Sequence, residues 1–599
     1  MNRLRTVLLL LLLWILQACG RTTTEGGGSD AGEVGTGGVD GAVAGQGDSG
    51  TAQGAGGGQA GLGTPDAAVA GEGGGVDASG AGGRDGGDAG SAGEPGAAGT
   101  GGGGVAGPGG AGTAGGAAAA GGELVWARRA GGSAEDFALS VSVVPDGSSL
   151  VAGYFRDTAT FGPGEPMETA LISTGEFGLF VARYKADGSL AWAKRAGVEE
   201  YDSGLSISVL GDGSALIAGS FLGTATFGPG ESGQTVLSAA GQRDVFVARY
   251  NAGGSLAWAK RAGGTGHDYG KSVSALVDGS LVVTGYFDDT ATFGDGEPGE
   301  TVLSVAPLGS QPTPYPRYDL FVARYHADGS LAWAKRAGGT GYDYGKSVSA
   351  LADGSALITG YFDRTATFGD GEPGETVLSA AGQLKRNDVF VARYNEDGSL
   401  AWAKRAGGKW YDYGHCVAAL ADGSALVTGS FDGTVTFGLG EPHETVLTSV
   451  GEFDLFVARY NANGSLAWVK RVGGTGQDSS VSALADGSAV VTGYFTATAT
   501  FGSGESRQTV LTAAGLRDVF VARYNADGSL AWARRAGGAG YDSGSSVSLL
   551  ASGSAVVTGS FDGTPTLGDG TATFGPGEPG ETVLTSAGSL DMFIARFAP

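Results

Sequence analysis

One unit of sequence is repeated seven times between residues 123 and 599, and this repetition constrains the fold more than any other feature. A phrase typified by AWAKR carries a tryptophan in every copy, at spacings of 64 to 75 residues. These tryptophans are Trp126, Trp192, Trp258, Trp333, Trp402, Trp468 and Trp532. Repeats of this kind bury their apolar surfaces against neighbouring copies, so the repeat has to be interpreted before any local motif.

Each copy consists of β-strand patterns. In VSALADGSALITGYF and in DVFVARYNADGSLAWARRAGG, apolar runs flank an Asp-Gly turn, which is a strong hairpin signal. The residues of DVFVARY alternate between two faces, as side chains of a strand do. Every copy therefore predicts at least four antiparallel strands, which we name A (SVSAL), B (ALITGYF), C (DVFVARY) and D (SLAWAKR).

Four-stranded units repeated around an axis are the blades of a β-propeller. Strand A contains small residues that suit the crowded axis, and strand D contains tryptophan, which suits the wide rim. Residues 123–599 also exceed the about 250–300 residues of a usual single core, whereas a ring of blades grows by repetition. The sequence therefore predicts an all-β, seven-bladed β-propeller with four-stranded antiparallel blades.

The two ends of the repeated region are complementary halves of one copy. It opens with GELVWARRAGG, a D strand without its C partner, and closes with DMFIARF, a C strand without its D partner. We expect the N-terminal D strand to pair with the C-terminal C strand. This pairing closes the ring and removes two exposed sheet edges.

The first residues predict export. Arg3 and Arg5 precede an apolar run from Val7 to Leu16, which is too short to cross a bilayer but suits a signal peptide. The following LQAC segment resembles the lipobox of bacterial lipoproteins. This resemblance implies that residues 1–18 are removed and that Cys19 is acylated, which gives a membrane anchor.

The predicted domains are therefore a signal peptide (1–18), the lipidated Cys19 with a linker (19–122), and the propeller (123–599). The linker is mostly Gly and Ala and has almost nothing large and apolar to bury, so we expect it to be disordered. Gly20 stands where an Asp would favour retention at the inner membrane of Gram-negative bacteria. The lipoprotein resemblance therefore implies a cell-envelope protein of the outer membrane, either periplasmic or surface-exposed.

The repeats also resemble a bacterial β-propeller repeat family often labelled SBBP. The shared features are an Asp-aromatic C strand, a Gly turn, a Gly-Gly ending to strand D, a Gly/Asp-rich loop and a VTG-like B strand. This resemblance implies the propeller fold and supplies no catalytic residues. The chain departs from the family by an added stretch between strands B and C, such as TATFGDGEPGETVLSAAG. Because of this difference, the resemblance does not imply a shared ligand.

The connections of a propeller lie on two faces. We call the face with the D–A and B–C connections the D–A face, and the face with the A–B and C–D turns the A–B face. The A–B and C–D turns are short and uniform, whereas the D–A and B–C connections are long and vary between copies. Variable loops on a constant scaffold favour the D–A face as the binding face, although simple tolerance of insertions is the alternative.

Every D–A loop contains one aspartate. These are Asp136, Asp202, Asp268, Asp343, Asp412, Asp478 and Asp542. A ring of carboxylates suits a cation, but a residue present in every copy is better explained as an acceptor of backbone hydrogen bonds in its own Gly-rich turn. We therefore predict no metal and no cofactor.

The position before this aspartate varies and is often aromatic, sometimes with a second aromatic residue beside it. The candidate ligand-binding residues are Tyr201, His267, Tyr342, Trp410, Tyr411 and Tyr541. Aromatic side chains on an exposed rim suit stacking on sugars or gripping peptides. Packing between adjacent loops is the alternative interpretation.

No catalytic constellation is visible. The four histidines occupy unlike positions, no HExxH, GxSxG or CxxC motif occurs, and the net charge of −25 argues against nucleic acid as a partner. We predict a monomeric, non-enzymatic, lipid-anchored binding or scaffold module for protein or polysaccharide. A carbohydrate-active lyase or hydrolase and a structural envelope component without a discrete ligand are the alternatives.

Overall fold

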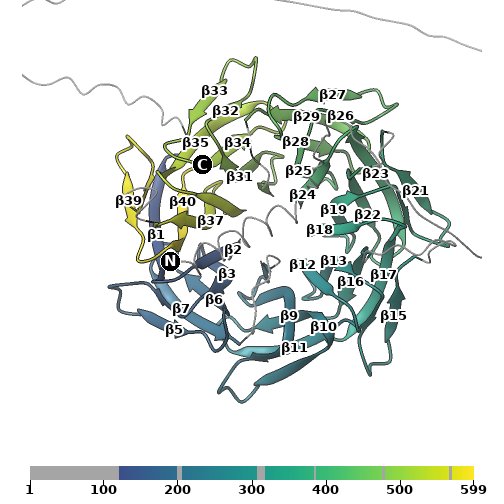
Figure 1. Ribbon diagram of the computed structural model, residues 1–599, viewed down its shortest axis with the longest axis horizontal. Coiled ribbons are helices and arrows are strands. Elements are labelled where there is room, and N and C mark those ends of the chain that lie inside the picture. The colour runs from purple at the N-terminus through teal and green to yellow at the C-terminus, as the bar shows by residue number, and fades with distance from the viewer. Residues whose placement is uncertain are drawn as a thin grey trace, which may run out of the picture. The chain divides into compact units, whose positions relative to one another are not determined.

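The computed structural model describes residues 121–197, 205–306, 317–382, 386–474, 476, 479–564 and 570–599. The regular elements in these ranges are all β-strands, and Figure 1 shows them grouped into sheets arranged radially around one axis. None of the described residues forms a helix that is long and apolar enough to cross a membrane. The predicted signal peptide, Cys19 and the predicted linker lie outside these ranges, apart from Gly121 and Gly122.

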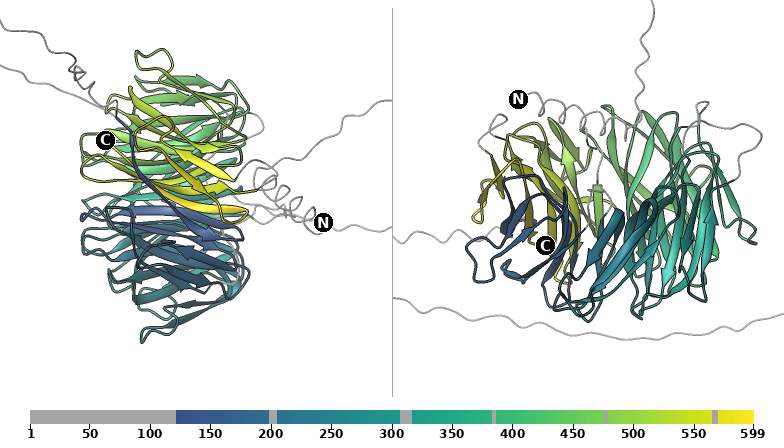
Figure 2. Two further views of the ribbon diagram at one scale, coloured as in Figure 1. Left: turned by 90° about the vertical axis from the view of Figure 1, so that its left-hand side faces the viewer. Right: turned by 60° about the horizontal axis from the view of Figure 1, so that its bottom comes forward.

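The strands form seven antiparallel four-stranded blades, which confirms the predicted fold class. In each blade strand A lies nearest the axis and strand D lies at the rim (Figure 1). Figure 2 shows the propeller from the side, where the strands run obliquely from one face to the other.

The blades are numbered along the chain, with their strands in the order A to D. Blade 1 contains β2 (Asp136–Val143), β3 (Ser149–Phe155), β6 (Gly178–Tyr184) and β7 (Leu190–Ala196). Blade 2 contains β8 (Ser206–Val209), β9 (Ala215–Phe227), β10 (Thr235–Tyr250) and β11 (Leu256–Ala262). Blade 3 contains β12 (Asp268–Ala275), β13 (Leu281–Phe287), β16 (Asp319–Tyr325) and β17 (Leu331–Gly339).

The remaining blades repeat this order. Blade 4 contains β18 (Asp343–Ala350), β19 (Ala356–Phe362), β22 (Asp388–Tyr394) and β23 (Leu400–Gly408). Blade 5 contains β24 (Asp412–Ala419), β25 (Ala425–Phe431), β28 (Asp454–Tyr460) and β29 (Leu466–Val472). Blade 6 contains β30 (Ser479–Ala483), β31 (Ala489–Phe495), β34 (Asp518–Tyr524) and β35 (Leu530–Gly538). Blade 7 contains β36 (Ser543–Leu549), β37 (Ala555–Asp562), β40 (Leu590–Phe597) and β1 (Leu124–Gly132).

Blade 7 joins the two ends of the propeller region. Strand β1 pairs antiparallel with β40, with Ala127 opposite Ala595 and Arg129 opposite Phe593. In Figure 1 the purple β1 lies beside the yellow β40. The predicted closure of the ring by the N-terminal D strand and the C-terminal C strand is therefore confirmed.

The connection between strands B and C differs from the expectation of a long loop on the D–A face. In every blade it folds back as a two-stranded ribbon along strand D of the preceding blade. In blade 4, for example, Thr367 and Ala366 pair with Gly338 and Gly339 at the end of β17. The chain reverses before this ribbon at Arg364, whose φ is 56°.

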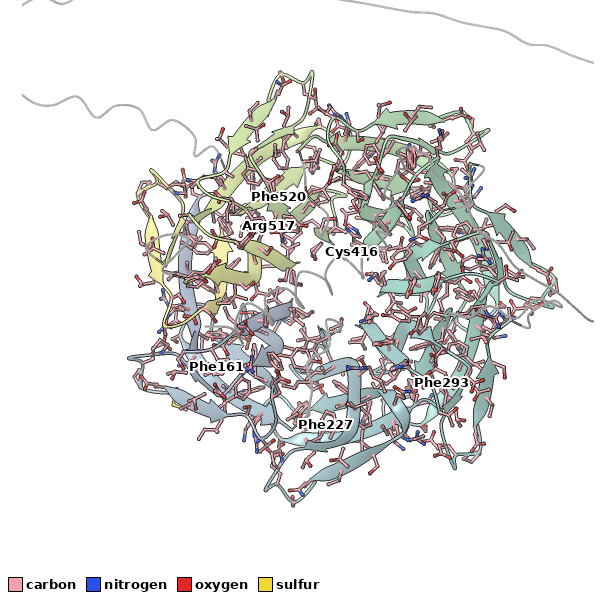
Figure 3. All side chains as sticks on the ribbon, in the orientation of Figure 1. Phe161, Phe227, Phe293, Cys416, Arg517 and Phe520 are labelled. Carbon is pink, nitrogen blue, oxygen red and sulfur yellow. The ribbon has the colours of Figure 1, made fainter. Side chains whose placement is uncertain are left out.

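The ribbon strands alternate between more buried and more exposed residues, as strands on a sheet surface do. They are β4 (Thr158–Phe161), β5 (Thr169–Ile172), β14 (Thr290–Phe293), β15 (Thr301–Ser304), β20 (Thr365–Phe368), β21 (Thr376–Ser379), β26 (Thr434–Phe437), β27 (Thr445–Thr448), β32 (Thr498–Phe501), β33 (Thr509–Thr512), β38 (Thr571–Phe574) and β39 (Thr582–Thr585), while β9 and β10 include the ribbon of blade 2. Figure 3 labels Phe161, Phe227 and Phe293, which end the first ribbon strand in successive blades. Each packs on a phenylalanine of strand C with ring centroids 4.8 to 5.0 Å apart.

A glutamate at the turn of each ribbon links adjacent blades. In blade 4, Glu372 Oε2 accepts a hydrogen bond of 2.7 Å from the backbone N–H of Leu400, the first residue of strand D. Its Oε1 lies 2.7 Å from Nζ of Lys335 on strand D of blade 3. The turn of the ribbon therefore lies at the start of strand D, beside the A–B face. The equivalent glutamates are Glu165, Glu231, Glu297, Glu441, Glu505 and Glu578.

The repeated tryptophan and the arginine of strand C also join one blade to the next. Trp258 Nε1 and Arg249 Nη1 both donate to the carbonyl oxygen of Ala327, in the C–D turn of blade 3, over 3.1 and 3.2 Å. Gly329 of the same turn lies against the indole, where a Cβ would come within 2.9 Å of Cδ2. The uniform strand D thus reflects a contact between blades, which we call the carbonyl clamp.

The carbonyl clamp recurs around the ring. The other described pairs are Trp126 with Arg596 on Ala186, Trp192 with Arg183 on Ala252, Trp333 with Arg324 on Glu396, Trp402 with Arg393 on Ala462, and Trp468 with Arg459 on Ala526. The first of these joins blade 7 to blade 1, so the ring closure uses the same contact as every other junction named here.

We predict that Glu372→Ala lowers the free energy of unfolding by about 1–3 kcal/mol, because the backbone N–H of the buried Leu400 loses its acceptor. Glu372→Gln is the matched control, since its amide oxygen still accepts that hydrogen bond. It loses only the ion pair with the partly exposed Lys335, which contributes about 0–1 kcal/mol. Chemical denaturation measures both variants, and equal losses would show that the backbone contact is not the important one.

Candidate functional site

The structure places the described candidate residues on the D–A face, at the entrances to the A strands. His267 precedes β12, Tyr342 precedes β18, Trp410 and Tyr411 precede β24, and Tyr541 precedes β36. Trp410 and Tyr541 are 37% and 46% exposed, and the other three are half-buried. Tyr201 lies outside the described residues.

Three of these candidates belong to one continuous set of ring contacts, which we call the aromatic row. It consists of His267, Tyr269, Tyr286, Tyr318, Tyr342, Tyr344, Tyr361, Tyr411 and Tyr413. Neighbouring ring centroids in the row are 4.4 to 6.3 Å apart. The row crosses blades 3, 4 and 5, so it breaks the sevenfold symmetry of the scaffold.

Strand register explains how the row forms. Tyr269 of β12 lies opposite Tyr286 of β13, and Tyr344 of β18 lies opposite Tyr361 of β19. Such cross-strand neighbours pack directly on each other. Contacts between blades then join these pairs, because the rings of Tyr286 and Tyr344 meet edge to face at 4.4 Å.

Cationic side chains lie over these rings. Lys271 Nζ is 5.0 Å from the centroid of Tyr269, and Lys346 Nζ is 5.6 Å from that of Tyr361. Arg386 lies 4.5 Å from the ring of Tyr411 and 5.4 Å from that of Trp410. These are cation–π distances, so Arg386 connects Trp410 to the row. In a chain with net charge −25, this part of the D–A face combines aromatic surface with positive charge.

Tyr541 does not join the row. It contacts Arg517, whose guanidinium is 5.5 Å from the Tyr541 ring and 4.1 Å from the ring of Tyr494. Figure 3 labels Arg517 on the side of the ring that blades 6 and 7 occupy. The structure therefore brings His267, Tyr342, Trp410 and Tyr411 together and leaves Tyr541 in a separate cluster.

The tyrosines of strands A and B, such as Tyr269, Tyr344 and Tyr361, were not predicted from the sequence. A comparison of the copies position by position contains the signal, because aromatic residues fill both strand positions in copies 1, 3 and 4, of which copies 3 and 4 are adjacent. The rings pack on one another, as the packing alternative expected. They also remain partly exposed, so the row offers aromatic surface to solvent.

The aspartates of the D–A loops have a structural role. Asp268 is fully buried, and its Oδ2 accepts a 2.7 Å hydrogen bond from the backbone N–H of Gly264. The same contact recurs for Asp136, Asp343, Asp412 and Asp542. Asp202 and Asp478 lie outside the described residues. Within the described part of the chain, no group of three or more His, Cys, Asp or Glu residues is placed to hold a metal ion.

Burial changes the titration of these carboxyls. Desolvation raises the pKa of Asp268 from 3.8 to about 8, and that of Asp136 likewise to about 8. It raises the pKa of Asp343 well above its usual value, and the neighbouring Asp319 carboxylate adds to this rise. Asp319 itself forms an ion pair with Arg336, whose Nη1 lies 2.7 Å from Oδ2 of Asp319. The raised pKa of Asp343 favours its protonated form, which lessens repulsion between the two buried carboxyls.

Comparisons with known proteins do not show which family the chain belongs to. No family model matches the sequence. An uncharacterized WD repeat-containing protein, L264, of Acanthamoeba polyphaga mimivirus is 22% identical over 511 residues, which cover 74% of this chain and 36% of that protein. The matched region thus spans only about a third of the relative's length.

Two solved structures are similar at low identity. The WD40 β-propeller domain of Doa1 is 10% identical with a TM-score of 0.35, covering 79% of this chain and 96% of that one. A gluconolactonase, XC5397 from Xanthomonas campestris, is 12% identical with a TM-score of 0.25, covering 64% of this chain and 90% of that one. At these scores the likenesses support no argument about the site.

We predict that the stability of the protein falls as the pH rises from about 4 to about 8. A carboxyl whose folded-state pKa is raised contributes stability that is present below its unfolded pKa and is lost as the pH rises through its folded pKa. Asp268→Asn removes one such group and keeps the acceptor for Gly264. The free energy of unfolding of this variant should therefore fall less steeply with pH than that of the wild type, and the two slopes should differ by up to about 1.4 kcal/mol per pH unit.

Chemical denaturation between pH 5 and pH 8 measures these slopes. Asp278→Asn is the control, because hydrogen bonds from Ser280 lower the pKa of Asp278 and place its titration below this range. Equal slopes for wild type and Asp268→Asn would contradict the account.

Proposed function

We propose that this protein is a binding or scaffold module that holds an extended protein or polysaccharide segment along the aromatic row. The observation that carries this proposal is the continuity of the row across three adjacent blades, with cations over its rings. A row of partly exposed rings offers several similar contact positions to a chain molecule, and each aromatic contact contributes about 0.5–1.5 kcal/mol. Repetition of weak contacts raises the overall affinity.

The charge of the row favours ligands that carry acidic groups. Lys271, Lys346 and Arg386 lie over its rings. Burial raises the pKa of the adjacent Asp268 to about 8 and raises that of Asp343 as well, which disfavours the charged forms of both carboxyls. The ligand class is therefore an acidic polysaccharide or an acidic peptide segment. The similarity to a WD repeat-containing protein supports a protein-binding scaffold, since propellers of the WD40 type typically act as such scaffolds.

We also propose that the propeller is anchored in the cell envelope, at the outer membrane, as an SBBP-type lipoprotein. In this proposal residues 1–18 are removed, Cys19 is acylated, and the linker tethers the propeller. The LQAC segment and the Gly/Ala-rich composition of residues 20–122 support it. Replacement of Cys19 by Ala should abolish labelling with a palmitate analogue, and retained labelling would refute the anchor.

We predict that the double variant Trp410→Ala/Tyr411→Ala weakens ligand binding at least about tenfold, because it removes the Arg386-bridged end of the row. The mature protein would be screened against immobilised acidic polysaccharides and envelope proteins, and the dissociation constant of each hit would be measured for both forms. The control is Tyr541→Ala, which removes an exposed tyrosine from the same face outside the row. Equal losses for the two variants, or none for the double variant, would contradict the assignment.

A further inference from the structure

A cavity of about 380 Å³ opens on the A–B face between blades 1 and 2. Its apolar lining includes Trp192, Ala191 and Ala252, and its polar lining includes Asp146, Arg183 and Lys185. Cavities from about 300 Å³ are large enough for small-molecule ligands. This cavity is distinct from the aromatic row, because it lies among the C–D and A–B turns at the other end of the strands.

Two residues distinguish this junction from the equivalent ones. The first position of the C–D turn is Lys185 in blade 1, whereas the other turns have Asn251, His326, Asn395, Asn461 and Asn525. The third position is Gly253 in blade 2, whereas the other turns have Asp187, Asp328, Asp397, Asn463 and Asp527. The cavity therefore gains one positive charge and lacks one polar, usually acidic, side chain.

The glycine leaves space at the edge of the cavity. A Cβ built on Gly253 would have nothing within 4 Å, so this position is open. In blade 4 the equivalent Asp397 occupies it, and its Oδ1 accepts hydrogen bonds of 2.9 and 2.6 Å from the N–H and hydroxyl of Ser399. Glycine at 253 thus removes both the bulk and the carboxylate from the rim of the cavity.

The other lining groups are held in place by the carbonyl clamp. Arg183 donates through Nη1 to the carbonyl of Ala252, through Nε to Ser148 Oγ and through Nη2 to Asp146 Oδ2, over 3.1, 3.0 and 2.8 Å. Trp192 Nε1 donates to the same carbonyl over 3.3 Å. The aromatic surface and the ion pair are therefore preorganised, which lowers the entropy lost on binding.

We propose that this cavity binds one acidic sugar residue, a hexuronate. The apolar face of the pyranose packs on Trp192 and the alanine methyl groups. Lys185 pairs with the carboxylate, supported by the charge of Arg183, and Asp146 accepts hydrogen bonds from ring hydroxyls. A charge-assisted hydrogen bond is about twice as strong as a neutral one, and the indole supplies a rigid apolar surface for the sugar ring. This site does not depend on the function proposed for the aromatic row.

The test uses digalacturonate as the probe and calorimetry on the mature full chain. Wild type should bind one equivalent. Lys185→Asn and Gly253→Asp should each weaken binding at least about tenfold, because one removes the cation and the other places a carboxylate in the site. Both substitutions introduce residues that other copies already carry at this position, so the thermal midpoint should not change.

A transplant supplies the reciprocal test. The junction of blades 5 and 6 has the same lining, with Asp422, Arg459 and Trp468 in the equivalent positions. The double variant Asn461→Lys/Asp527→Gly should therefore raise the stoichiometry from one to two. Three results would overturn the proposal: no binding by wild type, equal binding of neutral galactobiose or of acetate alone, or capture of a peptide with a free C-terminal carboxylate in preference to digalacturonate.

Discussion

The pairing of β1 with β40 is the contact on which the rest of the structure depends. Without it, blade 7 would lack its D strand and the ring would have a free edge on β40. The same segment supplies Trp126, which completes the carbonyl clamp on Ala186 of blade 1. One strand therefore closes the sheet and also joins the last blade to the first.

The repeated residues and the unrepeated residues have different roles. The tryptophan of strand D, the arginine of strand C, the ribbon glutamate and the D–A aspartate recur because each stabilises one blade or joins it to the next. The aromatic row and the cavity between blades 1 and 2 both occur where the copies differ from one another. The row depends on tyrosines of blades 3 to 5, and the cavity depends on Lys185 and Gly253. A symmetric scaffold thus presents two asymmetric surfaces, one on each face.

The sequence predicted much of the fold because the relevant signals are local and recur. Asp-Gly turns, alternating apolar residues and the two complementary ends specify the strands, the blade number and the closure. The ribbon was not predicted, because it pairs with a strand that is distant in sequence, the end of strand D in the preceding blade. Gly338 pairs with Thr367, and the hairpin of strands A and B of blade 4 lies between them in the chain. The row was only partly predicted, since the contact of Tyr286 with Tyr344 exists only between packed blades.

The most direct test of this account is thermal unfolding of the mature chain with residues 123–132 deleted. The midpoint should fall by a large amount, because the deletion removes β1 and with it both the sheet pairing and the Trp126 contact. Deletion of ten residues from the Gly/Ala-rich linker, 101–110, is the matched control and should leave the midpoint unchanged. An unaltered midpoint after loss of residues 123–132 would contradict the closed ring.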